Sequence, residues 1–172
     1  RVAPPSAVTE LRAHAVAQAM RLRRRLERAA AAGELLAGAG IPFAVWKGMP
    51  LSQLAHDDPY LRPSGDVDLW LPIAARTEAR RVLVARGWVR VEGEAPWEEA
   101  FERTVDGERE RLELHSHLQG DLLAHLPSWP WQARTVTLDG VALPAVADAA
   151  LALSLAIHHA RHRTAPLLWA AD

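Results

Sequence analysis

The sequence predicts an α/β (α+β) protein with a mixed, mainly antiparallel sheet of about five strands, flanked by helices, and helical N- and C-terminal parts. Three observations lead to this class. Residues 7–39 contain no proline and repeat apolar residues every three or four positions. Short apolar segments alternate with further helical patterns. Asp-Gly pairs at 106–107 and 139–140 are typical of hairpin turns.

Composition limits the kind of protein. The chain has 172 residues, enough for one domain, and no cysteine, which excludes disulfides and thiolate metal sites. We find neither a signal peptide nor an apolar run long enough to span a membrane, and we therefore expect a cytoplasmic protein that does not bind membranes. The net charge of −1 argues against a general nucleic-acid binder.

The first half of the chain predicts alternating helices and strands. The pattern over 7–39 indicates one long helix or two, with an interruption at Gly33 and an end at the glycines before Pro42. Apolar residues 43–46 indicate a buried strand. A short helix over 50–56 and a loop over 57–65 follow.

The second half begins with a strand over 66–71, in which apolar residues alternate with Asp66, Asp68 and Trp70. A helix over 73–86 ends at Gly87. The other expected elements are a strand over 88–91, a hairpin over 98–117, a small hairpin around 139–140 and a helix over 147–163.

We expect three parts along the chain: an N-terminal helical segment over 1–40 packed on the core, a core over 41–145, and the start of a C-terminal helical part over 146–172. Because the chain begins at Arg1 and stops just after an apolar run, we expect it to be a fragment.

Two aspartates two residues apart on a strand point to the same face. Asp66 and Asp68 form such a pair, and Glu113 occupies a similar position on a later strand. Carboxylates are the ligands that Mg²⁺ prefers, so these three residues form a candidate metal and catalytic site. The D-V-D pattern alone is also compatible with a solvated strand face.

Lys47 is the single lysine among nineteen arginines. It precedes Gly48 where the strand over 43–46 ends and a helix begins. Glycine permits close backbone approach, and helix N-terminal amides together with a lysine attract phosphate. By itself, a Lys-Gly pair is equally compatible with a solvated turn.

These motifs resemble the uncharacterised nucleotidyltransferase family of bacteria, a branch of the polymerase-beta-like nucleotidyltransferase superfamily. The family has a strand ending in K-G, a loop arginine, a D-I-D-L-L-V strand and a later L-E-L-H strand. The matching residues are Lys47-Gly48, Leu51, Arg62, Asp66 to Leu71, and Leu112 to His115, and the likeness covers roughly residues 34–172. The wider superfamily usually has Gly-Ser where this chain has Lys47-Gly48.

The resemblance implies a nucleotidyltransferase fold and metal-dependent transfer of a nucleoside monophosphate from an NTP, ATP in the first instance, with release of pyrophosphate. Asp66 and Asp68 would bind two Mg²⁺ ions, with Mn²⁺ as the alternative, and Glu113 would complete the site. The acceptor is unidentified and is a peptide or a small molecule. The expected nucleotide-binding residues are Lys47, Gly48, Arg62, Gly65, His158 and His162.

Several residues keep two interpretations. Arg62 is equally compatible with a free loop arginine. His115 and His117 share the predicted face of Glu113, as metal ligands or as hydrogen-bonding neighbours. His158 and His162 lie one helical turn apart, which suits a structural role, nucleotide contact or zinc binding.

Two further functions remain alternatives. The first is a non-catalytic domain that binds a nucleotide or a partner protein on the same fold. The second is an interaction domain acting through the arginine-rich helix over 12–28, which also fits a simple solvated face.

Overall fold

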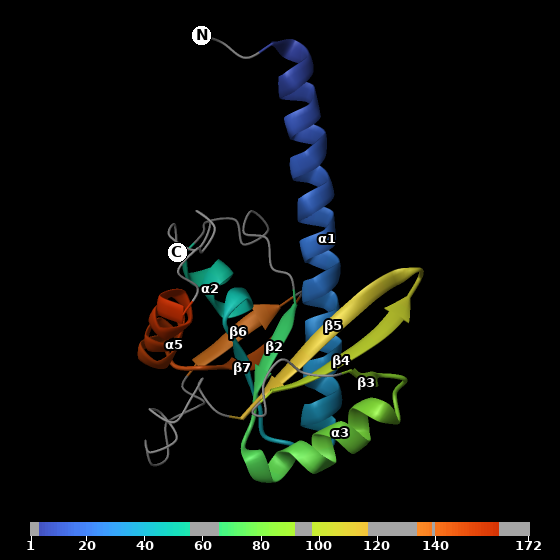
Figure 1. Cartoon of the computed structure of the whole chain (residues 1–172), viewed down its shortest axis with the longest axis vertical. Helices are drawn as coiled ribbons and strands as arrows, with labels where there is room; N and C mark the ends of the chain where they lie inside the picture. Colours follow the sequence, from blue (N-terminus) through green and yellow to red (C-terminus); the bar gives the residue numbers. More distant parts are fainter. Residues whose placement is uncertain (1–3, 56–65, 92–97, 117–133, 139, 162–172) are drawn as a thin grey trace.

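The computed structural model describes residues 4–55, 66–91, 98–116, 134–138 and 140–161. A seven-stranded sheet runs in the order β3-β4-β5-β2-β1-β7-β6 (Figure 1). Its strands are β1 (Ala44–Trp46), β2 (Val67–Trp70), β3 (Val89–Val91), β4 (Glu98–Val105), β5 (Glu108–His115), β6 (Arg134–Leu138) and β7 (Val141–Ala145). The described helices are α1 (Pro5–Gly38), α2 (Gly48–Ala55), η2 (Ile73–Ala75, a 3-10 turn), α3 (Arg76–Val84) and α5 (Asp148–Arg161).

The predicted fold class is confirmed, although the sheet has seven strands instead of about five. The β6–β7 hairpin explains the difference, because β7 pairs in parallel with β1 and so extends the sheet beyond the core strands. The β2–β5 pair is also parallel, whereas β1–β2, β3–β4, β4–β5 and β6–β7 are antiparallel. The sheet is therefore mixed and mainly antiparallel.

Helix α1 continues through Gly33, so the interruption expected there is wrong. A Cβ at this position would lie 2.8 Å from Cδ2 of Leu143 on β7, so the missing side chain lets the helix approach the sheet. The N-terminal half of α1 projects beyond the sheet (Figure 1), and Leu11 and Val16 there are exposed. Among the described residues, no helix has the length and apolar character needed to cross a bilayer.

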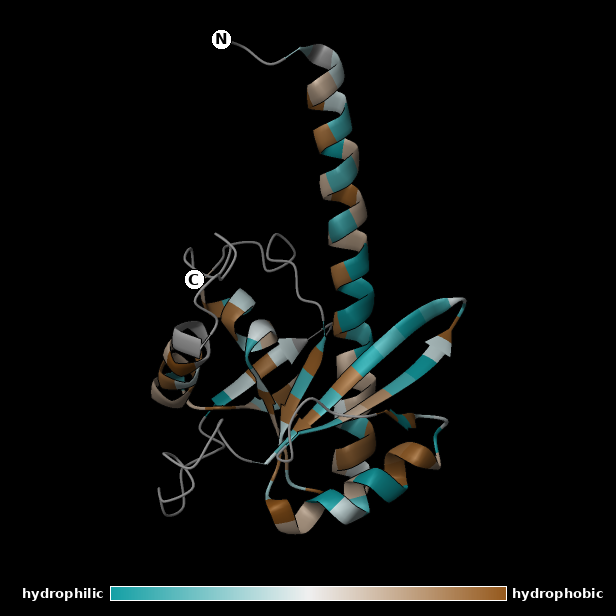
Figure 2. Ribbon diagram, in the orientation of Figure 1, coloured by the Kyte–Doolittle hydropathy of each residue, from teal (hydrophilic) through white to brown (hydrophobic). Residues whose placement is uncertain are grey.

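The alternation along β2 and β5 separates the two faces of the sheet, as predicted. Val67 and Leu69 of β2 pack with Leu112 and Leu114 of β5 in the core beneath α1 and α3. Figure 2 shows brown, hydrophobic segments on β2, near the C-terminal end of the otherwise teal β5 and on the lower part of α1. The intervening polar residues consequently face the other side of the sheet.

The β4–β5 turn falls at Asp106-Gly107, where the sequence predicts it. Both residues have positive φ angles, 51° and 78°. Successive positive φ values are characteristic of the tight hairpin turns whose twist matches that of the strands, and Asp-Gly accommodates them at low cost.

A second core on the polar face of the sheet joins β1 to α5. Trp46, Leu51 and Leu151 are buried there, and the indole Nε1 of Trp46 donates a hydrogen bond of 2.9 Å to Oγ of Ser154. The bond connects residues 108 positions apart. It therefore anchors α5 directly behind the end of β1.

We expect Ser154→Ala to lower the free energy of unfolding by about 1 to 3 kcal/mol, because it leaves the buried indole N–H of Trp46 without an acceptor. Urea denaturation measures the change. Ser52→Ala is the matched control: both hydroxyls are buried and donate to a backbone carbonyl three residues earlier, but within the described residues only Ser154 accepts a hydrogen bond from an indole. Equal losses in the two variants would contradict this role for Ser154.

Candidate metal and phosphate site

The strand register brings residues of three neighbouring strands, two of them acidic, into one row on the same face of the sheet. In the parallel β2–β5 pair Asp68 lies opposite Glu113, and in the antiparallel β1–β2 pair Trp46 lies opposite Asp68. Neighbouring strands are about 4.8 Å apart. Residues 46, 68 and 113 are thereby adjacent on one face, and Lys47 follows at the end of β1.

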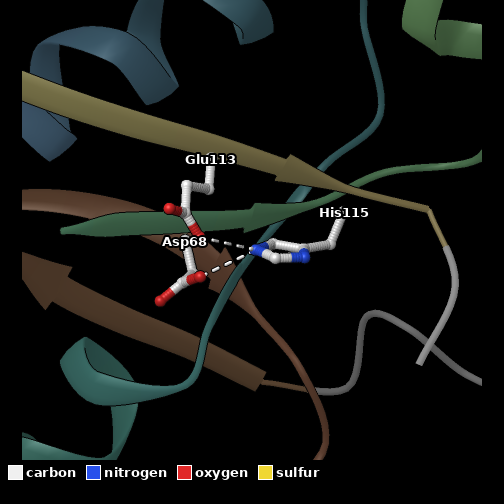
Figure 3. A group of neighbouring side chains, drawn as sticks. All are labelled: Asp68, Glu113 and His115. Atoms are coloured by element: carbon white, nitrogen blue, oxygen red, sulfur yellow. Dashed lines mark hydrogen bonds and ion pairs between the residues drawn. The ribbon is translucent and has the colours of Figure 1, made fainter. Parts of the chain in front are cut away.

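Asp68, Glu113 and His115 form a compact buried cluster (Figure 3). One ligand atom from each lies within 4.8 Å of the others. His115 Nε2 is 2.8 Å from Oδ1 of Asp68 and 3.5 Å from Oε2 of Glu113. The two carboxylates suit a hard divalent cation such as Mg²⁺ or Mn²⁺, whereas an imidazole is a donor more typical of zinc or iron sites.

Lys47 lies against this cluster. Its Nζ donates to Oδ1 of Asp68 at 2.6 Å, lies 3.3 Å from Nε2 of His115 and stands 4.8 Å from the ring centroid of Trp46. Its backbone has a φ of 55°, a left-handed conformation that costs a non-glycine residue about 1 kcal/mol or more. The bend points the chain into α2, which begins at Gly48. Lys47 therefore supplies a positive charge directly beside the carboxylates.

The ionic state of this group follows from its burial and pairing. Burial opposes the charge of Asp68, but Lys47 and His115 outweigh it and lower the pKa of Asp68 to about 2. Burial likewise opposes the charged forms of Lys47 and His115, yet the carboxylates raise the pKa of both. His115 Nε2 donates its proton to Oδ1 of Asp68, because an ionised carboxylate can only accept.

Glu113 is oriented from the side opposite Lys47. Arg111 Nε donates to Oε1 of Glu113 at 2.7 Å. Burial and the charge of Asp68 raise the pKa of Glu113, but hydrogen bonds from His115 and Arg111 prevail and lower it. Glu113 is consequently ionised beside Asp68, so the cluster offers two carboxylates to a divalent cation.

Asp66 lies outside the compact cluster but is coupled to it. The charge of Asp68, its own burial and the charge of Glu113 raise the pKa of Asp66 to about 7, against the smaller opposite influence of Lys47. The expectation that Asp66, Asp68 and Glu113 form the tight trio is thus met only for the last two, and His115 takes the third place. Asp66 directly precedes β2 and lies two residues before Asp68, on the same side of the strand.

The raised pKa of Asp66 predicts a pH-dependent cost to the fold. Its carboxyl ionises near pH 4 in the unfolded chain and near pH 7 in the folded one, so folding loses stability as pH rises between these values. With a chelator present, we expect Asp66→Asn to raise the free energy of unfolding by on the order of 2 kcal/mol at pH 8, and by progressively less as pH falls. Thermal unfolding across pH measures this.

The control for Asp66→Asn is Asp106→Asn, in the exposed β4–β5 turn, where asparagine also tolerates a positive φ. This variant should show no comparable gain at pH 8. A divalent cation should shrink the advantage of Asp66→Asn, because it neutralises the carboxylates. A gain that is independent of pH would contradict the interpretation.

Other expected site residues fall outside what the structure describes. Arg62, Gly65, His117 and His162 lie beyond the described residues. His158 belongs to α5, but its side chain is not described. Their expected roles stay predictions. The sequence pattern that identified Glu113 also pointed to His115, two residues later on the same strand face, as one of two options.

Several solved structures share this fold. A nucleotidyltransferase-like protein from Paracoccidioides brasiliensis matches with a TM-score of 0.58 and 14% identity over 86% of this chain and 72% of its own. ANT(2″)-Ia in complex with adenylyl-2″-tobramycin matches with a TM-score of 0.57 and 16% identity, covering 88% of this chain and 85% of that one. The lincosamide antibiotic adenylyltransferase LnuA, lincomycin-bound, gives 0.50 and 12%, covering 70% and 78%. At such identities the likeness shows the fold alone.

No curated protein has significant sequence similarity to the chain. The family model described as "Uncharacterised nucleotidyltransferase" matches residues 1–172, which includes α1 as well as the segment from residue 34 onward that the motifs indicate. The match covers the strand that ends at Lys47, the D-V-D strand and the strand that carries Glu113 and His115. The chain belongs to the uncharacterised nucleotidyltransferase family.

Proposed function

We propose that this protein transfers a nucleoside monophosphate from an NTP, ATP in the first instance, to a hydroxyl or phosphate group of an acceptor and releases pyrophosphate. One observation carries the proposal: Asp68, Glu113 and His115 converge within 4.8 Å beside Lys47, on a nucleotidyltransferase fold. In the reaction the acceptor oxygen bonds to the α-phosphorus. The bond from that phosphorus to the bridging oxygen breaks, and its electron pair leaves with pyrophosphate.

Asp68 and Glu113 would hold a divalent cation, Mg²⁺ or Mn²⁺, with His115 Nε2 fixing their carboxylates, and Asp66 would take part in binding a second one. Such cations neutralise the phosphate charge and make an acceptor hydroxyl easier to deprotonate. The chain itself holds its ligands in place: Arg111 orients Glu113, and His115 is fixed between Asp68 and Glu113. Preorganised charges of this kind act without rearrangement during the reaction.

Lys47 and the start of α2 would bind the triphosphate. The Nζ of Lys47 is a compact charge suited to phosphate oxygens, and the first amides of a helix favour an anion. With a cation bound to Asp68, Lys47 would contact the triphosphate, whose negative charge would take the place of the carboxylate that the lysine contacts in the structure. Arg62, Gly65, His158 and His162 remain proposed nucleotide contacts, on the resemblance alone.

The acceptor is proposed to be a small molecule or a peptide. LnuA and ANT(2″)-Ia, whose fold this chain shares, are an antibiotic adenylyltransferase and a protein solved with adenylylated tobramycin. Their likeness favours a small-molecule acceptor, although fold does not determine substrate.

Nucleotide binding and pyrophosphate release with Mg²⁺ or Mn²⁺ test the function. We expect an NTP to bind only when a divalent cation is present. We also expect slow release of pyrophosphate when water or an added hydroxyl compound serves as the acceptor. Failure of every common NTP to bind with either cation would reject the proposal.

The second candidate is nucleotide binding without turnover. It is favoured by one observation, that His115 and not Asp66 completes the compact cluster. Cation-dependent NTP binding without pyrophosphate release, for a range of acceptors, would support this candidate over the enzyme.

A further inference from the structure

A cavity of about 270 Å³ lies between α1 and the adjoining parts of β2 and β5. Figure 1 shows α1 running beside the β4–β5 hairpin, where this cavity is found. Four arginines line it: Arg25 and Arg28 from α1, and Arg109 and Arg111 from β5. Asp66 lines it as well, so the cavity borders the candidate metal and phosphate site.

Most of the arginine charge in this cavity is already paired. Arg28 contacts Glu110 at 2.7 Å and Glu108 at 3.1 Å. Arg109 contacts Glu102 at 2.5 Å, and Arg111 contacts Glu113 at 2.7 Å. The carboxylates are shared in turn, since Glu110 also accepts from Arg103 and Glu102 lies near Arg111. These paired carboxylates therefore have little negative charge left to balance a further guanidinium group.

Arg25 differs from these three. Within the described part of the chain, the ion pairs between α1 and the β4–β5 hairpin are made by Arg24 and Arg28, and none involves Arg25. Arg25 is half-buried, and its pKa is lowered by burial and by the charges of Arg21 and Arg28, against the attraction of Asp66. A partly dehydrated guanidinium among like charges favours an added anion.

Planar guanidinium groups bind oxyanions through two parallel hydrogen bonds, and the cavity is large enough for a phosphate or a carboxylate. The position of the cavity relative to Asp68 and Glu113 indicates which molecule carries the oxyanion. Arg111 lines the cavity and contacts Glu113, and Asp66 lines it and is coupled to Asp68, whereas Lys47 contacts Asp68 from β1. The triphosphate and the cavity ligand would therefore lie beside different residues of the carboxylate group.

We propose that this cavity binds an oxyanion group, a phosphate or a carboxylate, carried by the acceptor. The assignment to the acceptor rests on the proposed function, while the oxyanion site itself depends only on the cavity and its arginines. The acceptor is then an anionic small molecule or peptide, and a polycationic acceptor is disfavoured by Arg25 and its neighbours.

Inorganic phosphate, with acetate in a parallel arm, tests the site in the absence of nucleotide and divalent cation. Binding is followed through the arginine Nε–H resonances of the folded chain. We expect Arg25→Gln to weaken phosphate binding about tenfold or more, the loss typical of a charge-assisted contact. Glutamine is a good helix former, so α1 should persist, and thermal unfolding verifies this.

Two variants separate this site from simple charge effects. Arg21→Gln removes the same charge one helical turn away, at an exposed position outside the cavity lining, and should weaken binding far less. Lys47→Met should leave this phosphate site intact. Stronger binding of phosphate than of acetate would identify a phosphate-bearing ligand, and the reverse a carboxylate.

The inference is overturned if neither anion binds, if Arg21→Gln weakens binding as much as Arg25→Gln, or if the site is lost in Lys47→Met. Its failure is distinguishable from failure of the proposed function. Arg25-dependent phosphate binding without any NTP binding would reject the proposed nucleotidyl transfer and keep the oxyanion site. NTP turnover without phosphate binding would keep the proposed nucleotidyl transfer and reject the oxyanion site.

Discussion

Asp68→Asn is expected to reduce pyrophosphate release by about a thousandfold, the loss typical when a group that stabilises transition-state charge is removed. Asp68 connects the cluster to Lys47: the lysine and His115 both contact its Oδ1. An amide keeps the shape but loses the negative charge, and it is a poorer ligand for a hard cation. Steady-state pyrophosphate release and Mn²⁺ binding should fall together.

A matched control is needed because Asp68→Asn also leaves two cationic side chains without their carboxylate, which costs stability. Glu99→Gln provides it. The side chains of Asp68 and Glu99 are 4% and 5% exposed, and Glu99 is paired with Arg76 and Arg80, away from the cluster. We expect Glu99→Gln to lose stability and keep activity. Equal activity losses in both variants would show that the effect of Asp68→Asn comes from unfolding.

The strands and their faces could be predicted from local patterns. The alternation of Val67 and Leu69 with Asp66 and Asp68 identifies one buried face, because side chains on a strand point in opposite directions in turn. The Asp106-Gly107 turn is predictable for a similarly local reason, since both residues adopt a positive φ. These signals lie within a few residues of each other.

The order and register of the strands could not be predicted in this way. Asp68 lies opposite Glu113 only because β2 and β5 pair in parallel. Similarly, β7 pairs in parallel with β1 although the two strands are far apart in the sequence. No local pattern encodes which strands become neighbours. For the same reason the sequence suggested Glu113 as a partner of Asp68 but took Asp66 as the third member, where the structure has His115.

The contacts of Lys47 and Arg25 were harder still to anticipate. Sequence reasoning assigned Lys47 to phosphate, whereas in the structure its Nζ contacts Asp68 directly. Arg25 belongs to a run of arginines that is compatible with a solvated face, and only the docking of α1 on the sheet distinguishes it from Arg21 and Arg24. The role of a charged side chain thus depends on which opposite charges the fold brings near it.

Lys47→Met is expected to change cation and nucleotide binding in opposite directions. In the structure, Nζ of Lys47 lies 2.6 Å from the oxygen of Asp68 that a divalent cation would need, so lysine and cation compete for it. Removing the ammonium should raise Mn²⁺ affinity about tenfold in the absence of nucleotide. NTP affinity, measured at saturating Mn²⁺, should fall about tenfold, because the phosphates lose a positive charge.

Methionine keeps the length of the stem beside Trp46, and both residues meet the same backbone cost at a φ of 55°. Lys47→Arg is the matched control: it retains the charge and should keep the low Mn²⁺ affinity and much of the NTP affinity. Mn²⁺ titration by electron paramagnetic resonance and NTP titration by calorimetry give the two values independently. If both affinities fall in Lys47→Met, the residue supports the local structure only. If both are unchanged, its contact with Asp68 has no part in the site, and the exchange of lysine for a cation at Asp68 is wrong.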